Sequence, residues 1–112
     1  MDEAKFQQAC YMWFHNTYPA YRGLLCCNLN NSKNKVDGAL NRSKGVQPGR
    51  ADMVFYWNGR AVHIELKTPN GLQSKAQKEW QKLIISQGFN YVIVRSLNEF
   101  KALIEGILGQ NS

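Results

Sequence analysis

The chain has 112 residues, of which 44% are hydrophobic and 12% aromatic. This composition predicts a single globular domain over residues 1–112 and excludes an intrinsically disordered chain. Fourteen Lys and Arg residues against eight Asp and Glu residues give a formal net charge of +6, which favours a polyanionic partner, nucleic acid before a membrane surface. No apolar run reaches the roughly 20 residues of a membrane span, and the charged N-terminus is unlike a signal peptide, so we expect a cytoplasmic protein.

Three cysteines are present, Cys10 and the adjacent pair Cys26 and Cys27. Their number is odd, and their spacing matches neither a zinc site nor a disulfide framework. This pattern favours a reducing compartment in which the thiols are buried as small apolar groups.

Residues 2–17 are predicted to form a helix that ends before Pro19. Apolar residues from Phe6 onward recur at the i, i+3, i+4 and i+7 spacing of one helix face. Glu3 lies on the side of Phe6, at the edge of the predicted core. By its spacing it is either a surface acid that complements the helix dipole or a third carboxylate of a functional site.

The next segments change from apolar to polar. Residues 24–28 form a short apolar run that we expect to be a buried strand. Residues 29–49 are rich in turn-forming residues, with a short helix expected from Val36 to Lys44 and ended by Gly45.

Positive charge is concentrated in residues 33–50, which contain five Lys and Arg residues and one acidic residue. This stretch is either a mobile basic arm that contacts phosphates or a solvated loop. Gly49 would let the backbone or a phosphate come close to Asp52. The candidate phosphate-binding residues are Arg42, Lys44, Arg50 and, in a later helix, Lys75.

A β-hairpin is predicted over residues 52–67. Two runs rich in β-branched and aromatic residues are separated by Asn58-Gly59, a dipeptide typical of a type I′ turn. A two-residue turn fixes the register, so Asp52 should face Glu65, and Lys67 should lie on the same face as Glu65. The same register predicts the pairs Trp57–Arg60, Phe55–Val62 and Met53–Ile64.

The two acids that the register places opposite each other suggest a metal-binding site. Asp52 and Glu65 would repel each other unless a cation or a shared proton lay between them. A divalent metal fits, because hard cations bind carboxylate oxygens and keep positions open for water and phosphate. Lys67 adds a positive charge where a nucleophile or phosphoryl oxygen would lie. The pattern favours metal-assisted phosphodiester hydrolysis; the alternative is a surface hairpin with a solvated Glu65–Lys67 pair.

After the hairpin, Ser74 and Gln77 form a capping box for a helix that presents Trp80, Leu83 and Ile84 on one face and ends at Gly88. By spacing alone, Gln77 serves its own helix cap. Residues 91–94 form a continuous apolar strand, expected to be central or parallel to a neighbour. A second capping box at residues 96–99 begins a last helix. The order of elements predicts an α/β fold in which helices flank a mixed sheet.

An acid at the start of the second strand followed by Glu-x-Lys on the third resembles the PD-(D/E)xK nuclease superfamily. More narrowly, the chain resembles stand-alone, phage-type VRR-NUC domains, the virus-type replication and repair nucleases. The resemblance covers nearly the whole chain, and its most specific segments are residues 65–69 (Glu-Leu-Lys-Thr-Pro) and 77–80 (Gln-Lys-Glu-Trp). Ala51 departs from the pattern, since many members have proline there. The resemblance implies a restriction-endonuclease-like αβββαβ core with an extra C-terminal helix.

The resemblance also implies a site. Asp52, Glu65 and the main-chain carbonyl of Leu66 would bind Mg²⁺ or Mn²⁺, and Lys67 would orient or stabilise the attacking water. Gln77 and Glu3 would join the catalytic residues.

The implied activity is that of a homodimeric, structure-specific endonuclease that resolves four-way (Holliday) DNA junctions, since symmetric cuts need two sites related by a twofold axis. The alternatives are a flap, nick or non-specific DNA nuclease of the same fold, and a basic DNA-binding module without catalysis. In each case the cations would contact phosphates, so the shape of the DNA rather than its sequence would select the substrate.

Overall fold

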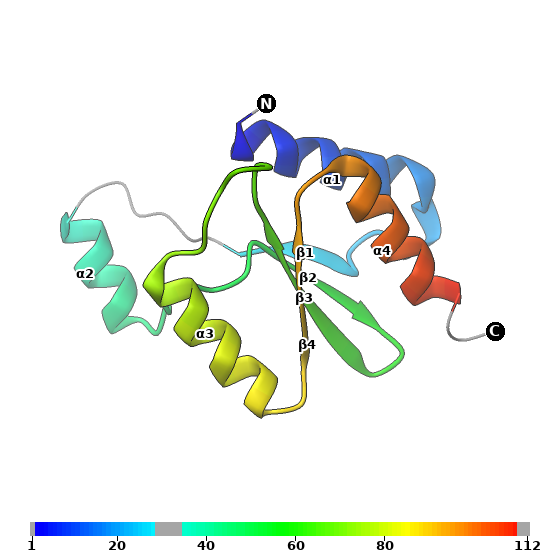
Figure 1. The fold of residues 1–112 in the computed structure, drawn as a ribbon. Coiled ribbons are helices and arrows are strands. Elements are labelled where there is room, and N and C mark those ends of the chain that lie inside the picture. Colours follow the sequence, from blue (N-terminus) through cyan, green and yellow to red (C-terminus); the bar gives the residue numbers. More distant parts are fainter. Residues whose placement is uncertain (1, 29–34, 110–112) are drawn as a thin grey trace.

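The computed structural model describes residues 2–28 and 35–109, and it confirms the predicted order of helices and strands (Figure 1). Asp2 caps the first helix by accepting a hydrogen bond from the Lys5 amide at 2.8 Å. The elements are α1 (Glu3–Thr17), a short 3-10 helix (Pro19–Tyr21), β1 (Leu25–Cys27), α2 (Lys35–Ser43), β2 (Met53–Trp57), β3 (Arg60–Leu66), α3 (Lys75–Ser86), β4 (Asn90–Val94) and α4 (Leu97–Gly109).

The four strands form one sheet in the order β1-β2-β3-β4. β1 and β2 are antiparallel, as are β2 and β3, whereas β3 and β4 are parallel. Asn58 and Gly59 have φ angles of 48° and 75°, as a type I′ turn requires. The hairpin pairs have the predicted register: Trp57–Arg60, Phe55–Val62 and Met53–Ile64. The strand over residues 90–94 is parallel to its neighbour, as expected, but lies at the sheet edge.

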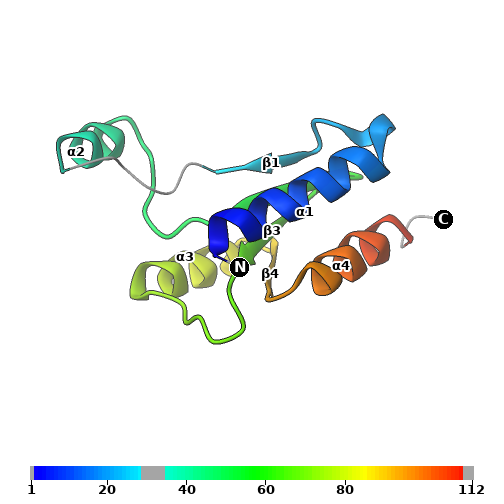
Figure 2. The same ribbon diagram turned by 90° about the horizontal axis from the view of Figure 1, so that it is seen from above.

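The main core lies between one face of the sheet and helices α1 and α4 (Figures 1 and 2). Phe14 of α1 packs against Phe55 of β2, with ring centres 5.5 Å apart. Alternate residues of β3 point into this core, so the residues between them, including Glu65, point to the opposite face. The buried apolar side chains include Phe6, Cys10, Phe14, Met53, Phe55, Val62, Ile64, Leu66, Phe100 and Ile104.

The opposite face of the sheet is covered by α3 alone among the described helices, and more thinly (Figure 1). Trp80 packs against His63 and Tyr91, with ring centres 5.2 and 6.1 Å away. No residue of α3 is fully buried. Leu83, which the helical periodicity placed on the buried face, is 59% exposed, because a single helix on this face leaves its outer turns uncovered.

The polar segment before the hairpin contains the expected short helix, α2, with Gly45 in a positive-φ conformation (96°) just after it. In both ribbon views α2 stands apart from the layers around the sheet (Figures 1 and 2). Lys33, part of the predicted basic stretch, lies outside the described residues. None of the helices that the structure describes is long and apolar enough to cross a membrane.

The expectation that all three thiols are buried is wrong. Cys10 is fully buried in the core, and burial raises its pKa to about 12. Cys26 and Cys27 are exposed, because β1 is a short edge strand that places only Leu25 in the core. All three cysteines are free.

Candidate active site

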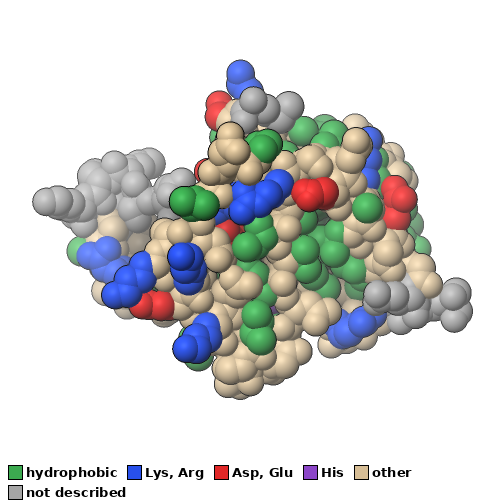
Figure 3. All heavy atoms as spheres, in the orientation of Figure 1, with side chains coloured by type: hydrophobic (Ala, Val, Ile, Leu, Met, Phe, Trp, Pro, Cys, Tyr) green, Lys and Arg blue, Asp and Glu red, His purple; other side chains and the backbone are tan. Residues whose placement is uncertain are grey.

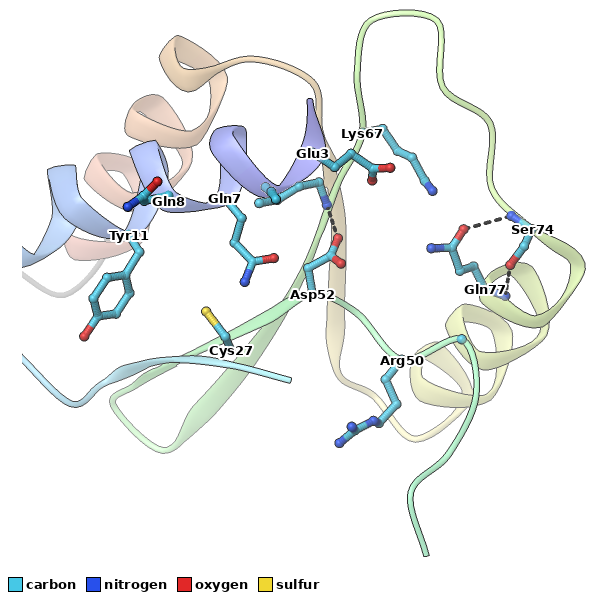
Figure 4. Close-up of a pocket in the computed structure, with 13 residues that line it drawn as sticks. Glu3, Gln7, Gln8, Tyr11, Cys27, Arg50, Asp52, Lys67, Ser74 and Gln77 are labelled. Carbon is cyan, nitrogen blue, oxygen red and sulfur yellow. Dashed lines mark hydrogen bonds between the residues drawn. The ribbon is translucent and has the colours of Figure 1, made fainter. Parts of the chain in front are cut away.

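A cavity of about 610 Å³ lies where the N-terminal halves of α1 and α3 approach the start of β2 and the end of β3 (Figure 4). The hairpin register brings Asp52 and Lys67 to this end of the sheet, and the two helices add residues from either side. Six residues that the sequence suggested for a site line the cavity: Glu3, Arg50, Asp52, Leu66, Lys67 and Gln77. The fold brings these six residues together, and their roles in binding or catalysis are predictions.

Asp52 directly precedes β2 and reaches across to β3. Its Oδ2 atom accepts a hydrogen bond at 2.7 Å from the backbone amide of Leu66, the residue after Glu65. Burial raises the pKa of the Asp52 carboxyl, and the negative charges of Glu3 and Glu65 raise it further. The Leu66 hydrogen bond and the Lys67 ammonium oppose this shift. Asp52 is therefore a carboxylate held among other acids.

Glu65 is fully buried and does not line the cavity. Its Oε1 atom accepts hydrogen bonds from Gln73 Nε2, at 2.9 Å, and from the Tyr91 hydroxyl. Its Oε2 atom is buried and accepts no hydrogen bond from the residues that the structure describes. The Lys67 ammonium lies 3.8 Å from Oε2. One oxygen of this carboxylate is thus saturated by donors, while the other faces a cation.

Lys67 follows the last residue of β3, and its amide donates a hydrogen bond to the Val94 carbonyl of β4 at 3.0 Å. This hydrogen bond continues the parallel pairing one residue beyond β3 and fixes the backbone position from which the Lys67 side chain extends. Lys67 is only 7% exposed, although it lines the cavity. A solvated surface pair of Glu65 and Lys67, the alternative considered for the hairpin, does not match this burial.

Gln77 forms the predicted helix cap and also lines the cavity. Its Oε1 accepts a hydrogen bond from the Ser74 amide at 2.8 Å, and its own amide donates to Ser74 Oγ at 3.1 Å, which completes the predicted capping box. Its Nε2 is turned toward the cavity (Figure 4). Glu3, in the first turn of α1, lies on the opposite side of the same opening (Figure 4).

The four candidate DNA-binding residues occupy different positions. Arg50 lines the cavity, with Nη1 3.5 Å from Asn28 Oδ1. Arg42 and Lys44 are exposed at the end of α2, away from the cavity lining. Lys75 is exposed at the start of α3 and lies 3.8 Å from Glu79. Figure 3 shows Lys and Arg side chains gathered over α2 and α3.

Gly49 has a structural function that its sequence context only partly indicated. Its φ is 75°, and a Cβ atom at this position would lie 2.3 Å from the Ala76 carbonyl oxygen in the first turn of α3. Glycine therefore lets the chain that leads into Arg50 and Asp52 pack directly against α3. The observed close approach is therefore between Gly49 and α3, and an approach of a phosphate to Asp52 stays a prediction.

Residues missed by the sequence analysis hold the site in place. Tyr91 and Gln73 bind Glu65, as described above. Arg95 Nη1 donates to the carbonyl oxygens of Thr68 and Gly71, at 3.0 and 2.8 Å, and so ties down the loop after Lys67. No local sequence pattern marks these partners. Tyr91 lies opposite His63 when β3 and β4 pair in parallel, so its place near Glu65 could be predicted only once this pairing was known.

The donor set fits a divalent cation in two respects. Glu65 Oε2 is a buried carboxylate oxygen without a hydrogen-bond donor among the described residues, a costly arrangement that a cation would relieve. Burial, and after it the charges of Glu3 and Glu65, raise the pKa of Asp52, and a bound cation would favour its ionised form. Within residues 2–28 and 35–109, no three His, Cys, Asp or Glu side chains are grouped as a metal site. The available donors are the carboxylates of Asp52 and Glu65 and main-chain oxygens such as that of Leu66.

Comparison with known proteins identifies the architecture. Among solved structures, the chain is similar to one described as "VRR_NUC domain protein", with a TM-score of 0.80 and 18% sequence identity over 97% of this chain and 89% of that chain. The chain has the VRR-NUC fold. This confirms the predicted restriction-endonuclease-like α/β architecture. No protein-family model and no curated protein sequence matches the chain. At 18% identity the likeness establishes the VRR-NUC fold alone.

Proposed function

We propose that this protein is a divalent-metal-dependent, structure-specific DNA endonuclease that hydrolyses phosphodiester bonds. The observation that carries the proposal is the grouping of Asp52, Glu65 and Lys67 at one end of the hairpin. Asp52 and Lys67 line the cavity, and the buried Glu65 has its Oε2 atom 3.8 Å from the Lys67 ammonium. A VRR-NUC fold supports it, because the same three positions carried the sequence resemblance to nucleases. The Lys and Arg side chains gathered over α2 and α3 suit a polyanionic substrate (Figure 3).

In this proposal Asp52, Glu65 Oε2 and the Leu66 carbonyl hold Mg²⁺ or Mn²⁺. When bound, such an ion supplies positive charge to the scissile phosphate and makes water a better nucleophile at neutral pH. Lys67 provides a fixed positive charge that orients the attacking water and stabilises charge on the phosphoryl oxygens. Gln77 can donate from Nε2 to an oxygen in the cavity while its Oε1 stays bound to the helix cap.

The DNA would lie over the cavity and the adjacent basic surface. Arg50, which lines the cavity, would contact a phosphate there, and the exposed Arg42, Lys44 and Lys75 would contact phosphates further away. These long cationic side chains neutralise phosphates without reading base edges. Selection by DNA shape follows, which is the property expected of an enzyme for branched DNA.

We further propose that two copies act together, since one chain holds one site and a four-way junction is resolved by two symmetric cuts. A second cavity, of about 390 Å³, lies among β3, α3, β4 and α4. We propose this cavity as the docking surface. Ile85 and Phe89 line it and are 51% and 45% exposed, and the partly buried Val92 and Leu103 add apolar surface; Arg60 also lines it. We assign a second copy of the chain to this surface, where it would cover the exposed apolar groups.

A cleavage panel tests this function. The protein would be incubated with an immobile four-way junction, a flap, a nicked duplex and a linear duplex, each with Mg²⁺ and with Mn²⁺, beside the variant Asp52→Asn. We expect paired, symmetric nicks on the junction that vanish with the variant. Cutting confined to flaps or nicks would instead support another nuclease activity of the same site. Binding without any cleavage would support the non-catalytic alternative.

A further inference from the structure

The two oxygens of the Glu65 carboxylate have sharply different surroundings. Oε1 accepts two hydrogen bonds, one from Gln73 Nε2 at 2.9 Å and one from the Tyr91 hydroxyl. Oε2 accepts none from the described residues and lies 3.8 Å from the Lys67 ammonium. Because the side chain is fully buried, bulk water does not hydrate the two oxygens and so does not offset the difference in their hydrogen bonding. Only Oε2 is free to take a new ligand without breaking a hydrogen bond.

Both donors to Oε1 are themselves fixed. The Gln73 amide nitrogen also donates to Gln81 Oε1 on α3, at 2.7 Å, so both of its N–H groups have acceptors. Tyr91 lies on β4 beside Trp80, with ring centres 6.1 Å apart, and the strand pairing places it opposite His63. The donors come from a loop and a strand that follow Glu65 in the sequence, and they converge on one atom.

We propose that Tyr91 and Gln73 are positioning residues that reserve Glu65 Oε1 for the protein and leave Oε2 as a single-oxygen ligand, so that the site favours Mg²⁺ and Mn²⁺ over Ca²⁺. This inference rests on the proposed metal-dependent function. Mg²⁺ requires six ligands in near-ideal octahedral geometry, which single carboxylate oxygens and waters satisfy. Ca²⁺ takes six to eight oxygens and often uses both oxygens of one carboxylate. Holding Oε1 in hydrogen bonds withholds that second oxygen from Ca²⁺.

The test measures metal binding by thermal stabilisation, without any assay of cleavage. Metal-stripped protein would be titrated with Mg²⁺, Mn²⁺ and Ca²⁺ separately, and the midpoint concentration recorded for each ion. Tyr91→Phe removes one donor and Gln73→Leu the other, whereas Tyr56→Phe removes a hydroxyl from a tyrosine that is 48% exposed on β2 and serves as the matched control. Gln81→Leu, which removes the partner of Gln73, should give a weaker form of the same effect.

We expect the Mg²⁺ and Mn²⁺ midpoints to rise about 10-fold to 100-fold in Tyr91→Phe and Gln73→Leu, as for other residues that orient metal ligands. The Ca²⁺ midpoint should rise less or fall, so the ratio of the Ca²⁺ to the Mg²⁺ midpoint decreases. Tyr56→Phe should match the unmodified protein. Since Gln73 lies on a loop and is only partly buried, Gln73→Leu decides the matter if Tyr91→Phe does not fold.

Two outcomes overturn the inference in distinguishable ways. A lower melting temperature without metal, combined with an unchanged ratio of midpoints, would mean that Tyr91 and Gln73 serve stability alone. No stabilisation of the unmodified protein by any of the three ions, with Asp52→Asn behaving identically, would overturn the metal centre itself and this inference with it.

Discussion

The carboxylate of Asp52 is bound to the backbone amide of Leu66, with Oδ2 2.7 Å from the nitrogen. This hydrogen bond links the residue before β2 to the last residue of β3, directly beside Glu65 and Lys67. A main-chain donor is insensitive to side-chain substitution, so the position of residue 52 is fixed by the backbone of the hairpin. An asparagine can accept the same hydrogen bond through its amide oxygen, which allows charge to be removed while the bond is kept.

Asp52→Asn should therefore abolish cleavage while leaving the fold and DNA binding intact. The loss of a charged metal ligand should lower the cleavage rate by more than about 100-fold. DNA affinity should stay the same or increase, because one negative charge is removed near the phosphates. Gel cleavage and fluorescence anisotropy on the same four-way junction measure the two properties. Equal cleavage by both proteins would exclude Asp52 from the site.

The pH dependence of stability provides a second test. The pKa of Asp52 is raised, first by burial and then by Glu3 and Glu65, so the native state holds this proton more tightly than the unfolded state does. The stability contributed by the protonated form is fully present below the unfolded pKa of about 3.9 and is lost as the pH rises through the native pKa. Without metal, Asp52→Asn should then melt at a higher temperature than the unmodified protein.

The informative quantity is the difference between the two melting temperatures, because other titrating groups are common to both proteins. This difference should grow as the pH is raised from about 4 toward neutrality. Adding Mn²⁺ at neutral pH should reduce it by stabilising the unmodified protein only. A difference that shrinks as the pH rises would contradict the position assigned to Asp52 among the acids.

Lys67→Met tests the buried ammonium group. At saturating DNA the cleavage rate should fall by about 100-fold or more, as when another fixed electrostatic donor is removed from an active site. Without metal the protein should also lose about 3 kcal/mol of stability, because Glu65 would be left buried without its cation. Lys82→Met, at an exposed position on α3, is the matched control and should change stability by less than about 0.5 kcal/mol. Retained activity in Lys67→Met would remove the lysine from the mechanism.

Gly49→Ala should be far more damaging than Gly88→Ala. Both glycines have positive φ, 75° and 87°, so both substitutions carry a backbone cost of about 1 kcal/mol. A Cβ at Gly88 meets no atom within 4 Å, whereas at Gly49 it would lie 2.3 Å from a backbone oxygen of α3. We expect a larger drop in melting temperature for Gly49→Ala, with loss of cleavage as Arg50 and Asp52 shift. Equal melting temperatures would mean that α3 moves aside freely.

The basic surface is tested by the salt dependence of DNA binding. Replacing Arg42 and Lys44 by alanine should weaken binding to all DNA structures and lower the slope of log affinity against log salt by about 0.9 for each phosphate that is no longer neutralised. Lys101→Ala is the control, since Lys101 lies on α4, across the sheet from α3, with its Nζ 5.8 Å from the Trp13 ring centre. An unchanged slope in the double variant would place the DNA elsewhere.

Features fixed by neighbouring residues could be predicted from the sequence. The Asn58-Gly59 turn determined the hairpin register down to the pair Met53–Ile64, because a two-residue turn leaves no freedom in pairing. The start of α3 followed from Ser74 and Gln77 in the same way. The edge position of β4 could not be predicted, because its apolar run fits a central strand as well as an edge strand that has α3 on one face and α4 on the other.

The candidate site was predictable where it depends on the hairpin and not where it depends on tertiary pairing. The same register placed Asp52 and Lys67 at one end of the sheet. The complete burial of Glu65 and its bonds to Gln73 and Tyr91 arise from the parallel pairing of β3 with β4 and from the loop before α3. Glu3 and Gln77 entered through the family resemblance, since their spacing alone favoured a helix-dipole acid and a helix cap.

The most direct test of the metal centre is anomalous diffraction from crystals soaked in Mn²⁺. We expect a strong peak in contact with the Asp52 carboxylate and Glu65 Oε2, and no such peak in crystals of Asp52→Asn. No peak between these two carboxylates, or a peak there that survives in Asp52→Asn, would contradict the assignment of Asp52 and Glu65 as the metal-binding pair.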